Sequence, residues 1–173
     1  MIQTLNYKDD GIIKSSSGMI PHDVYKTILD NVPLLCVDLV IVRENKVFLI
    51  KRKNKPCQGA YWIQGGRVIK NENLEQCGIR KAASELNIPE DKIKLIKFLG
   101  TFSTEFCDSE QGNSAHTVNV TFQAEIDDIP LSFDKDHSDG RWFDINGSLP
   151  PELKNIYVHH PYIAEILKLI KPQ

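Results

Sequence analysis

The sequence lacks several features that would each point to a particular class of protein. Its 173 residues carry a formal net charge of only −2 at pH 7, so no strong positive field attracts nucleic acid or an anionic membrane surface. No apolar stretch approaches the roughly 18 residues that a membrane-spanning helix requires. The chain also begins without a basic segment followed by an apolar run. We therefore expect no nucleic acid partner, no membrane association and a cytoplasmic location.

The sequence lacks the cysteine spacing of a metal site. The four cysteines, at positions 36, 57, 77 and 107, are widely separated and form no C-x-x-C pair. This spacing argues against a zinc site and against a disulfide framework. It is typical of reduced thiols in the cytosol.

Composition favours a single soluble domain. Hydrophobic residues make up 41% of the chain and charged residues 25%, with no internal repeat and no low-complexity tract. This is enough apolar material for one core. The polar, turn-rich residues 1–18 are predicted to form an N-terminal arm that orders only by packing on something else. Residues 19–173 are predicted to form the domain.

Hydrophobic periodicity predicts a mixture of helices and strands. Helical spacing of apolar residues occurs at 21–32, 74–86 and 160–171. The middle helix is predicted to begin with a capping box formed by Asn73 and Gln76. Strands are predicted at 34–43, 46–52, 60–64, 93–106, 115–126 and 141–145. Gly65 and Gly66 are expected to end the third strand. This order predicts an α/β (α+β) fold with one mixed β-sheet sandwiched between helices.

The segment that joins the third strand to the middle helix has the spacing of a known motif. Four residues match the pattern G-x5-E-x7-R-x4-E within the Nudix box: Gly66, Glu72, Arg80 and Glu85. The full box reads G-x5-E-x7-R-E-U-x-E-E-x-G-U, where U is a bulky aliphatic residue. Three positions differ from its Glu, Glu and Gly: Lys81, Ser84 and Asn87. The box is therefore degenerate, and it has lost two carboxylates.

Motifs on both sides of the box make the resemblance more specific. They are Val37-Asp38-Leu39, Lys51-Arg52, Asn54-Lys55-Pro56, Gln58-Gly59-Ala60-Tyr61-Trp62, Gly65-Gly66-Arg67-Val68 and His137-x-Asp139-x-Arg141-Trp142. Together with the box they resemble the GDP-mannose mannosyl hydrolases, a branch of the Nudix hydrolase superfamily with the same degeneracy. The resemblance implies a Nudix fold, a magnesium ion and a homodimer. It also implies hydrolysis of a nucleotide sugar at the sugar carbon, where other Nudix enzymes attack phosphorus.

The acidic residues that remain favour one metal ion. In a full box, carboxylates three and four residues apart on one helix face gather more than one Mg²⁺, which suits attack of water on phosphorus. Here only Glu85 remains on the last turn, and Mg²⁺ accepts one or two carboxylates together with backbone, water and phosphate oxygens. We expect one Mg²⁺ per active site, or Mn²⁺ in its place, bound by Glu85 and the Gly65 carbonyl. Because the relatives carry a metal-binding amide at the position of Asp136, the resemblance adds that carboxylate as a ligand.

Attack of water at the anomeric carbon needs a base, whereas a neutralised diphosphate needs no acid in order to leave. His137 is the candidate base, because the ordinary pKa of histidine, about 6.5, lies close to neutral pH. This chemistry predicts inversion at C1. The alternative for His137 is a residue of a surface loop, since Asp-His-Ser-Asp-Gly has the composition of a turn.

Further side chains are assigned to the diphosphate and the sugar. Arg52, also counted as catalytic, and Arg67 are expected to bind the diphosphate, because guanidinium groups pair with phosphate oxygens. Asp38 lies in an otherwise apolar strand and needs a partner. The resemblance gives Asp38 a contact with the substrate, and the alternative is an ion pair with an arginine. Structural support of the box is assigned to Gly66, Glu72 and Arg80.

These features predict Mg²⁺-dependent hydrolysis of GDP-mannose or a similar GDP-hexose to GDP and free sugar. Two alternatives stay open: a conventional Nudix pyrophosphohydrolase that releases GMP and a sugar phosphate, and a catalytically silent sensor of nucleotide sugars. The preferred sugar is not predicted, because three features differ from the relatives: the shorter loop 107–114, Thr117 and Gly140.

Overall fold

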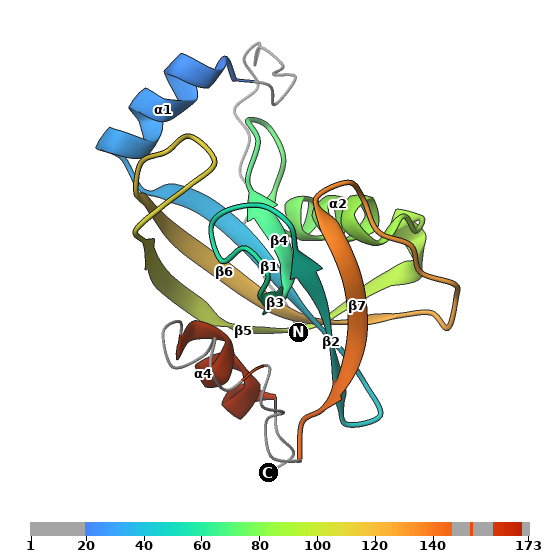
Figure 1. Ribbon diagram of the computed structural model, residues 1–173. Helices are drawn as coiled ribbons and strands as arrows, with labels where there is room; N and C mark the ends of the chain where they lie inside the picture. The colour runs from blue at the N-terminus through green and yellow to red at the C-terminus, as the bar shows by residue number, and fades with distance from the viewer. Residues whose placement is uncertain (1–19, 147–152, 154–160, 171–173) are drawn as a thin grey trace.

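The computed structural model describes residues 20–146, 153 and 161–170, and its elements follow the predicted order (Figure 1). The helices are α1 (His22–Asn31), α2 (Leu74–Leu86) and α4 (Pro161–Leu169), with a 3₁₀ turn η1 (Glu90–Lys92). The strands are β1 (Leu34–Arg43), β2 (Lys46–Arg52), β3 (Tyr61–Trp62), β4 (Gln64–Arg67), β5 (Ile93–Phe106), β6 (Ala115–Ile126) and β7 (His137–Asp144). The predicted arm, residues 1–18, lies outside the described residues. No helix within the described ranges is long and apolar enough to cross a bilayer.

The strands form one seven-stranded sheet. Its main path runs β3-β2-β1-β6-β5, while β4 pairs with β1 and β7 pairs with β2. The β1–β6 pairing is parallel and the other pairings are antiparallel, which confirms the predicted mixed sheet. Strand β1 changes partner along one edge, from β4 in its first half to β2 in its second. The β4 pairing brings Gly65 opposite Asp38.

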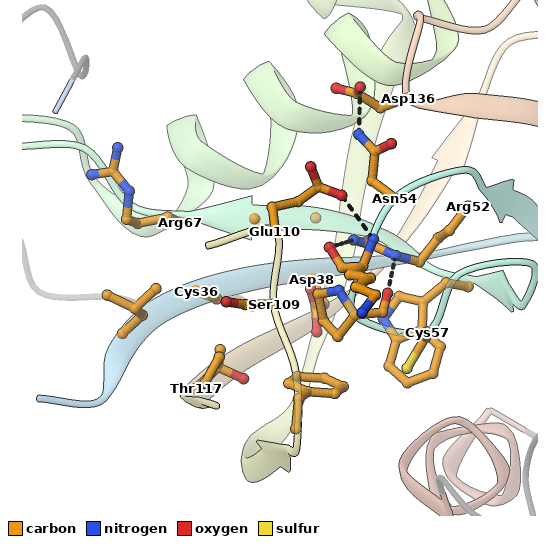
Figure 2. Close-up of a pocket in the computed structure, with 18 of the residues that line it drawn as sticks. Cys36, Asp38, Arg52, Asn54, Cys57, Arg67, Ser109, Glu110, Thr117 and Asp136 are labelled. Carbon is orange, nitrogen blue, oxygen red and sulfur yellow. Dashed lines mark hydrogen bonds between the residues drawn. The ribbon is translucent and has the colours of Figure 1, made fainter. Parts of the chain in front are cut away.

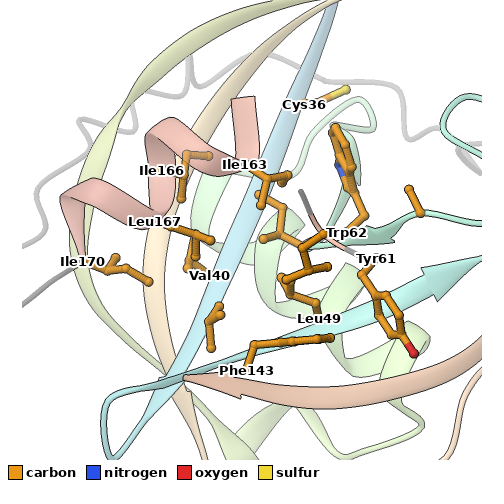
Figure 3. Close-up of a cluster of buried hydrophobic side chains, with 14 of the residues drawn as sticks. Cys36, Val40, Leu49, Tyr61, Trp62, Phe143, Ile163, Ile166, Leu167 and Ile170 are labelled. Carbon is orange, nitrogen blue, oxygen red and sulfur yellow. The ribbon is translucent and has the colours of Figure 1, made fainter. Parts of the chain in front are cut away.

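Alternate side chains of β1 belong to two separate cores. Val37, Leu39 and Ile41 are fully buried in the core beneath α2. Val40 belongs instead to the core that contains Ile163 of α4 (Figure 3). The two-residue period of a strand produces this division. The sheet therefore lies between α2 and α4, as the hydrophobic pattern predicted.

Helix α2 begins and ends where the sequence predicted. Its capping box is complete, because Asn73 Oδ1 accepts from the Gln76 amide (2.8 Å) and Gln76 Oε1 accepts from the Asn73 amide (3.0 Å). Asn87 ends the helix in the left-handed region with φ 50°, a conformation that asparagine tolerates better than most residues. Gly78 lets the helix approach the sheet closely, since a Cβ there would lie 2.8 Å from Leu39 Cδ2.

The prediction of a third strand over 60–64 that ends at the double glycine was wrong. The segment is divided into β3 and β4, and β4 continues through Gly65 and Gly66. Gly65 makes this possible, because β4 runs so close to β1 that a Cβ on Gly65 would lie 2.6 Å from the Val37 carbonyl oxygen. The two glycines therefore serve close packing of strands in addition to the following turn.

The last strand is longer than the predicted 141–145 and begins at His137. It extends further because β7 pairs with β2 as far as the Arg52–His137 position. Gly140 is explained by packing within this strand, since a Cβ there would lie 2.5 Å from Phe133 and 2.7 Å from Phe48. The glycine therefore makes room for two aromatic rings.

Candidate active site

A pocket of about 330 Å³ is lined by residues of β1, β2, β4, β7, α2 and α4 and of neighbouring loops (Figure 2). It contains all the residues predicted to act in catalysis, substrate binding and metal binding: Asp38, Arg52, Gly65, Arg67, Glu85, Asp136 and His137. Gly66 also lines this pocket, whereas Glu72 and Arg80 do not. These residues come from five separate elements, so the sheet and its two cores define the position of the site.

Glu72 and Arg80 connect α2 to the loop before it. Arg80 donates from Nε to Glu72 Oε2 (2.8 Å) and from Nη2 to Glu72 Oε1 (2.7 Å), and it also reaches the Arg67 carbonyl (3.3 Å). Glu72 Oε1 accepts from the Ile69 amide (2.7 Å). Although partial burial acts in the opposite direction, these hydrogen bonds hold the pKa of Glu72 below its ordinary value. The pair is placed to support the loop between Arg67, at the end of β4, and the start of α2.

Glu85 lies on the last turn of α2 with its side chain almost completely buried. Its Oε2 accepts from the Gly65 amide (3.2 Å), and its Oε1 forms an ion pair with Lys81 Nζ (2.9 Å) one turn earlier. Burial raises the pKa of Glu85 above its ordinary value, although Lys81 and His137 act against this. A positive charge therefore occupies the place where a full box has a carboxylate.

His137 lies at the start of β7 and is only 7% exposed, so its alternative assignment to a surface loop was wrong. Its Nδ1 is 2.7 Å from Asp134 Oδ1, which also accepts from the Asp136 amide (3.0 Å). The Asp134 amide in turn donates to the Glu85 carbonyl (3.2 Å). In the tautomer in which Nδ1 donates to this carboxylate, Nε2 keeps the free lone pair that a base needs. This is the geometry of a base oriented by a carboxylate.

Asp38 has a tyrosine as its hydrogen-bond partner, not an arginine. Its Oδ2 accepts from the Tyr162 hydroxyl (2.6 Å), which lies 3.0 Å from Thr121 Oγ1. Burial, with a smaller contribution from Glu85, raises the pKa of Asp38 to about 7, against the hydrogen bond from Tyr162. The Asp38 carboxyl therefore takes up a proton more readily than an exposed aspartate does, and in its protonated form it can also donate a hydrogen bond.

The two arginines lie on opposite sides of Asp38 in the close-up view (Figure 2). Arg52 Nε donates to the Pro56 carbonyl (2.8 Å), so its guanidinium also holds the loop that follows β2. The guanidinium of Arg67 lies over the ring of Tyr25, 5.5 Å from the centroid. Both arginines bring positive charge to the pocket wall. Their contact with a diphosphate stays a prediction.

The carboxylates of the pocket fit one magnesium ion that substrate and water complete. Among the residues that the structure describes, no group of three His, Cys, Asp or Glu side chains forms a metal site by itself. Glu85 and Asp136 both line the pocket, and Asp136 Oδ1 accepts from Asn54 Nδ2 (2.6 Å). Mg²⁺ is usually held by one or two carboxylates with phosphate oxygens of the substrate. The site fits this arrangement and does not fit the metal cluster of a full box.

The pocket also contains residues that the sequence did not single out. Asp134 precedes His137 by three residues, and a search for acidic neighbours of the candidate base would have found it. Tyr162 had no such signal, because it lies 124 residues from its partner Asp38. Burial raises the pKa of Cys36 to about 12 and that of Cys57 to about 11, so neither pocket thiol is a nucleophile at neutral pH.

A mixed sheet between two helices, with a glycine-led box beside a charged pocket, defines a hydrolase of the Nudix type. The sequence profile of the NUDIX domain matches residues 33–163. The chain therefore belongs to the Nudix hydrolase family.

The chain is similar to two relatives of known name and to a solved structure. It is 35% identical over 150 residues to the low-salt glycan biosynthesis protein Agl8 of Haloferax volcanii, covering 86% of this chain and 88% of that protein. It is 29% identical over 137 residues to an ADP-ribose pyrophosphatase of Methanocaldococcus jannaschii, covering 79% and 74%. A MutT NUDIX hydrolase from Burkholderia pseudomallei is similar in structure, with a TM-score of 0.60, 22% identity, and coverage of 82% of this chain and 100% of that one. At that identity the structural likeness shows the fold alone.

Proposed function

We propose that this Nudix hydrolase converts GDP-mannose or a similar GDP-hexose to GDP and free sugar, through attack of water at the anomeric carbon. The observation that carries the proposal is the His137–Asp134 pair, which is held in the wall of the pocket with an Nδ1–Oδ1 distance of 2.7 Å. Attack at carbon needs an oriented base on the side opposite the leaving group. Attack at carbon also requires fewer metal ligands than attack at phosphorus, because the metal only neutralises the leaving group.

The charges near Glu85 support carbon attack over phosphorus attack. Metal-assisted attack on a diphosphate phosphorus relies on cations that activate the water and clamp the oxygens. Lys81 fills one of the missing acidic positions with an ammonium group, and Ser84 leaves the other without a charge. A Mg²⁺ bound by Glu85, the Gly65 carbonyl and Asp136 would supply charge neutralisation to the departing diphosphate.

In the proposed mechanism each pocket side chain has one task. His137 Nε2 accepts a proton from the attacking water, and Asp134 orients the ring and stabilises the imidazolium. Arg52 and Arg67 bind the diphosphate and neutralise its charge as the bond from C1 to oxygen breaks. Asp38 binds a sugar hydroxyl. Because water attacks opposite to GDP, the free sugar is released with inverted configuration.

The choice of a nucleotide sugar has support from one relative. Agl8 is named for glycan biosynthesis, and the building of glycans consumes activated sugars. The preference for guanine and for a hexose comes from the resemblance of the motifs around the box. The predicted homodimer and the cytoplasmic location do not bear on the site and stay predictions.

A conventional pyrophosphohydrolase is the second candidate function. It is favoured by the relative named as an ADP-ribose pyrophosphatase, at 29% identity. Asp136 and Glu110 are among the carboxylates that line the pocket in addition to Glu85, and they are potential oxygen ligands. This enzyme would cleave between the two phosphates and release GMP with a sugar phosphate.

Product analysis separates these functions. Purified protein with Mg²⁺ is incubated with a panel of nucleotide sugars, and products are followed by ³¹P and ¹H nuclear magnetic resonance. We expect GDP and free hexose, with the first-formed anomer inverted relative to the substrate. GMP together with hexose phosphate would establish the pyrophosphohydrolase. Tight binding of GDP-sugars without turnover would establish the silent sensor.

A further inference from the structure

Lys81 is a charged pocket residue that the mechanism above does not use in binding. Its Nζ forms the 2.9 Å ion pair with Glu85 Oε1, and its side chain is 28% exposed. It lines the same pocket as Arg52 and Arg67. The ammonium group is therefore held inside the site while part of the side chain remains open to the cavity.

The surrounding structure makes space for this side chain. A Cβ on Gly66 would lie 2.6 Å from Lys81 Cε and 3.1 Å from Lys81 Cδ. The lysine stem thus passes directly over the backbone of β4, where any residue larger than glycine would force it to move. The missing side chain of Gly66 leaves the space through which Lys81 reaches Glu85 and the pocket.

The ion pair with Glu85 does not engage all the hydrogen-bond donors of the Lys81 ammonium group. A lysine has three N–H donors, and the ion pair with Glu85 engages one direction. A lysine is also an effective phosphate ligand as a point charge, and its contacts are stronger in a site that excludes water. The carboxylate likewise offers about four lone-pair sites, so Lys81 and a metal ion can share it.

We propose that Lys81 binds the substrate diphosphate directly and serves as a cationic ligand built into the active site. It supplies part of the positive charge that a second divalent ion would supply in a full box. The inference rests on the proposed binding of a diphosphate substrate in this pocket, but not on which bond is broken. It predicts that a diphosphate binds to the protein even when every divalent metal ion has been removed.

The test uses inorganic pyrophosphate, which carries a diphosphate without base or sugar. Its dissociation constant is measured by isothermal titration calorimetry in excess EDTA. We expect Lys81→Met to weaken binding by about tenfold or more, because a charge-assisted contact inside the pocket is lost. Lys94→Met is the matched control, since it removes the same charge from an exposed lysine of β5 that does not line the pocket. We expect it to change the affinity by less than about twofold.

A second pair of variants separates the loss of a phosphate contact from an effect on folding. Lys81→Met leaves Glu85 buried without its cation, so the comparison is repeated in the Glu85→Gln background, where no unpaired charge remains. Glu85→Gln alone frees Lys81 and removes a repelling carboxylate, and we expect it to bind pyrophosphate about five- to tenfold more tightly. Adding Lys81→Met should abolish that gain. Circular dichroism and urea unfolding confirm that each variant is folded.

Equal effects of Lys81→Met and Lys94→Met, or no pyrophosphate binding by the unaltered protein in EDTA, would overturn the proposal. Failure of the proposed function has a different signature, because GMP and hexose phosphate would appear among the products while the calorimetric comparison stayed as predicted. The two claims are therefore tested separately.

Discussion

At the scale of residues, the site contains ionisable side chains that each contact a defined side-chain partner. Glu85 pairs with Lys81, Asp38 accepts from Tyr162, and His137 contacts Asp134. A buried ionisable group without such a partner would be costly. The partners of Glu85 and Asp38 therefore oppose the effect of burial on the pKa of these groups, and Asp134 orients His137. Each pairing gives a measurable effect.

Asp134 is a positioning residue for the proposed base. We expect Asp134→Asn to lower kcat by about 10- to 100-fold, because the amide keeps an acceptor near Nδ1 but no longer stabilises the imidazolium. His137→Ala should lower kcat by about 10²- to 10⁴-fold. Steady-state kinetics and calorimetric titration with GDP check both variants. Unchanged kcat for Asp134→Asn, or a loss of GDP affinity equal to the loss of kcat, would contradict the assigned role.

Asp38 should make stability depend on pH. Its pKa is raised to about 7 in the folded protein, so the folded state binds a proton more tightly than the unfolded chain does. The resulting stability is present below the ordinary pKa of aspartate and is lost as the pH rises through about 7. We expect the advantage of Asp38→Asn over the unaltered protein to grow between about pH 4 and pH 7, by up to about 1.4 kcal/mol per pH unit, and then to level off.

Urea unfolding at a series of pH values measures this difference in the free energy of unfolding. Asp91→Asn is the control, because Asp91 is exposed on η1. A constant difference between Asp38→Asn and the unaltered protein over the whole range would contradict the assignment.

At the scale of elements, helix α2 links the stability of the sheet to the geometry of the site. One of its faces packs on the sheet through Gly78 and Leu86, and the same helix carries Lys81 and Glu85 into the pocket. The packing residues and the pocket residues therefore lie on the same few turns of α2. A displacement of the helix axis should therefore disturb stability and binding together.

Gly78→Ala separates packing from helix propensity. Alanine favours a helix over glycine by about 1 kcal/mol, but its Cβ would lie 2.8 Å from Leu39 Cδ2 and 3.0 Å from Val37 Cγ1. Because the core side chains have little room to move, we expect a net loss of about 1–3 kcal/mol in the free energy of unfolding. Ser84→Ala, at an exposed position of the same helix, should change stability by less than about 0.5 kcal/mol. A stabilised Gly78→Ala variant would show that propensity outweighs packing here.

At the scale of the whole molecule, most of the fold was predictable because it follows local patterns. The bounds of β1 and β2 and the capping box of α2 depend on residues that are close together in the sequence, and the structure confirms them. The double glycine was misread as a strand end, because its reason is the approach of β4 to β1, which lies far away in the sequence. The extension of β7 back to His137 likewise depends on its pairing with β2.

The sequence predicted many residues of the site but not the contacts between them. The box and its flanking motifs named the residues that line the pocket, because their spacing is local. The hydrogen bond between Tyr162 and Asp38 joins residues 124 positions apart, and no local pattern encodes it. Lys81 was visible only as a missing carboxylate, and its ion pair with Glu85 gives that substitution a physical meaning.

The most direct test of the account is the position of the oxygen that hydrolysis introduces. The reaction is run with GDP-mannose and Mg²⁺ in water enriched in oxygen-18, and the nucleotide product is analysed by mass spectrometry. Attack at the anomeric carbon predicts GDP without label and the new oxygen on the sugar. Free sugar incubated in the same water is the control for exchange of the anomeric oxygen. Label on a phosphate of GDP or GMP would contradict the account, because water would then have attacked phosphorus.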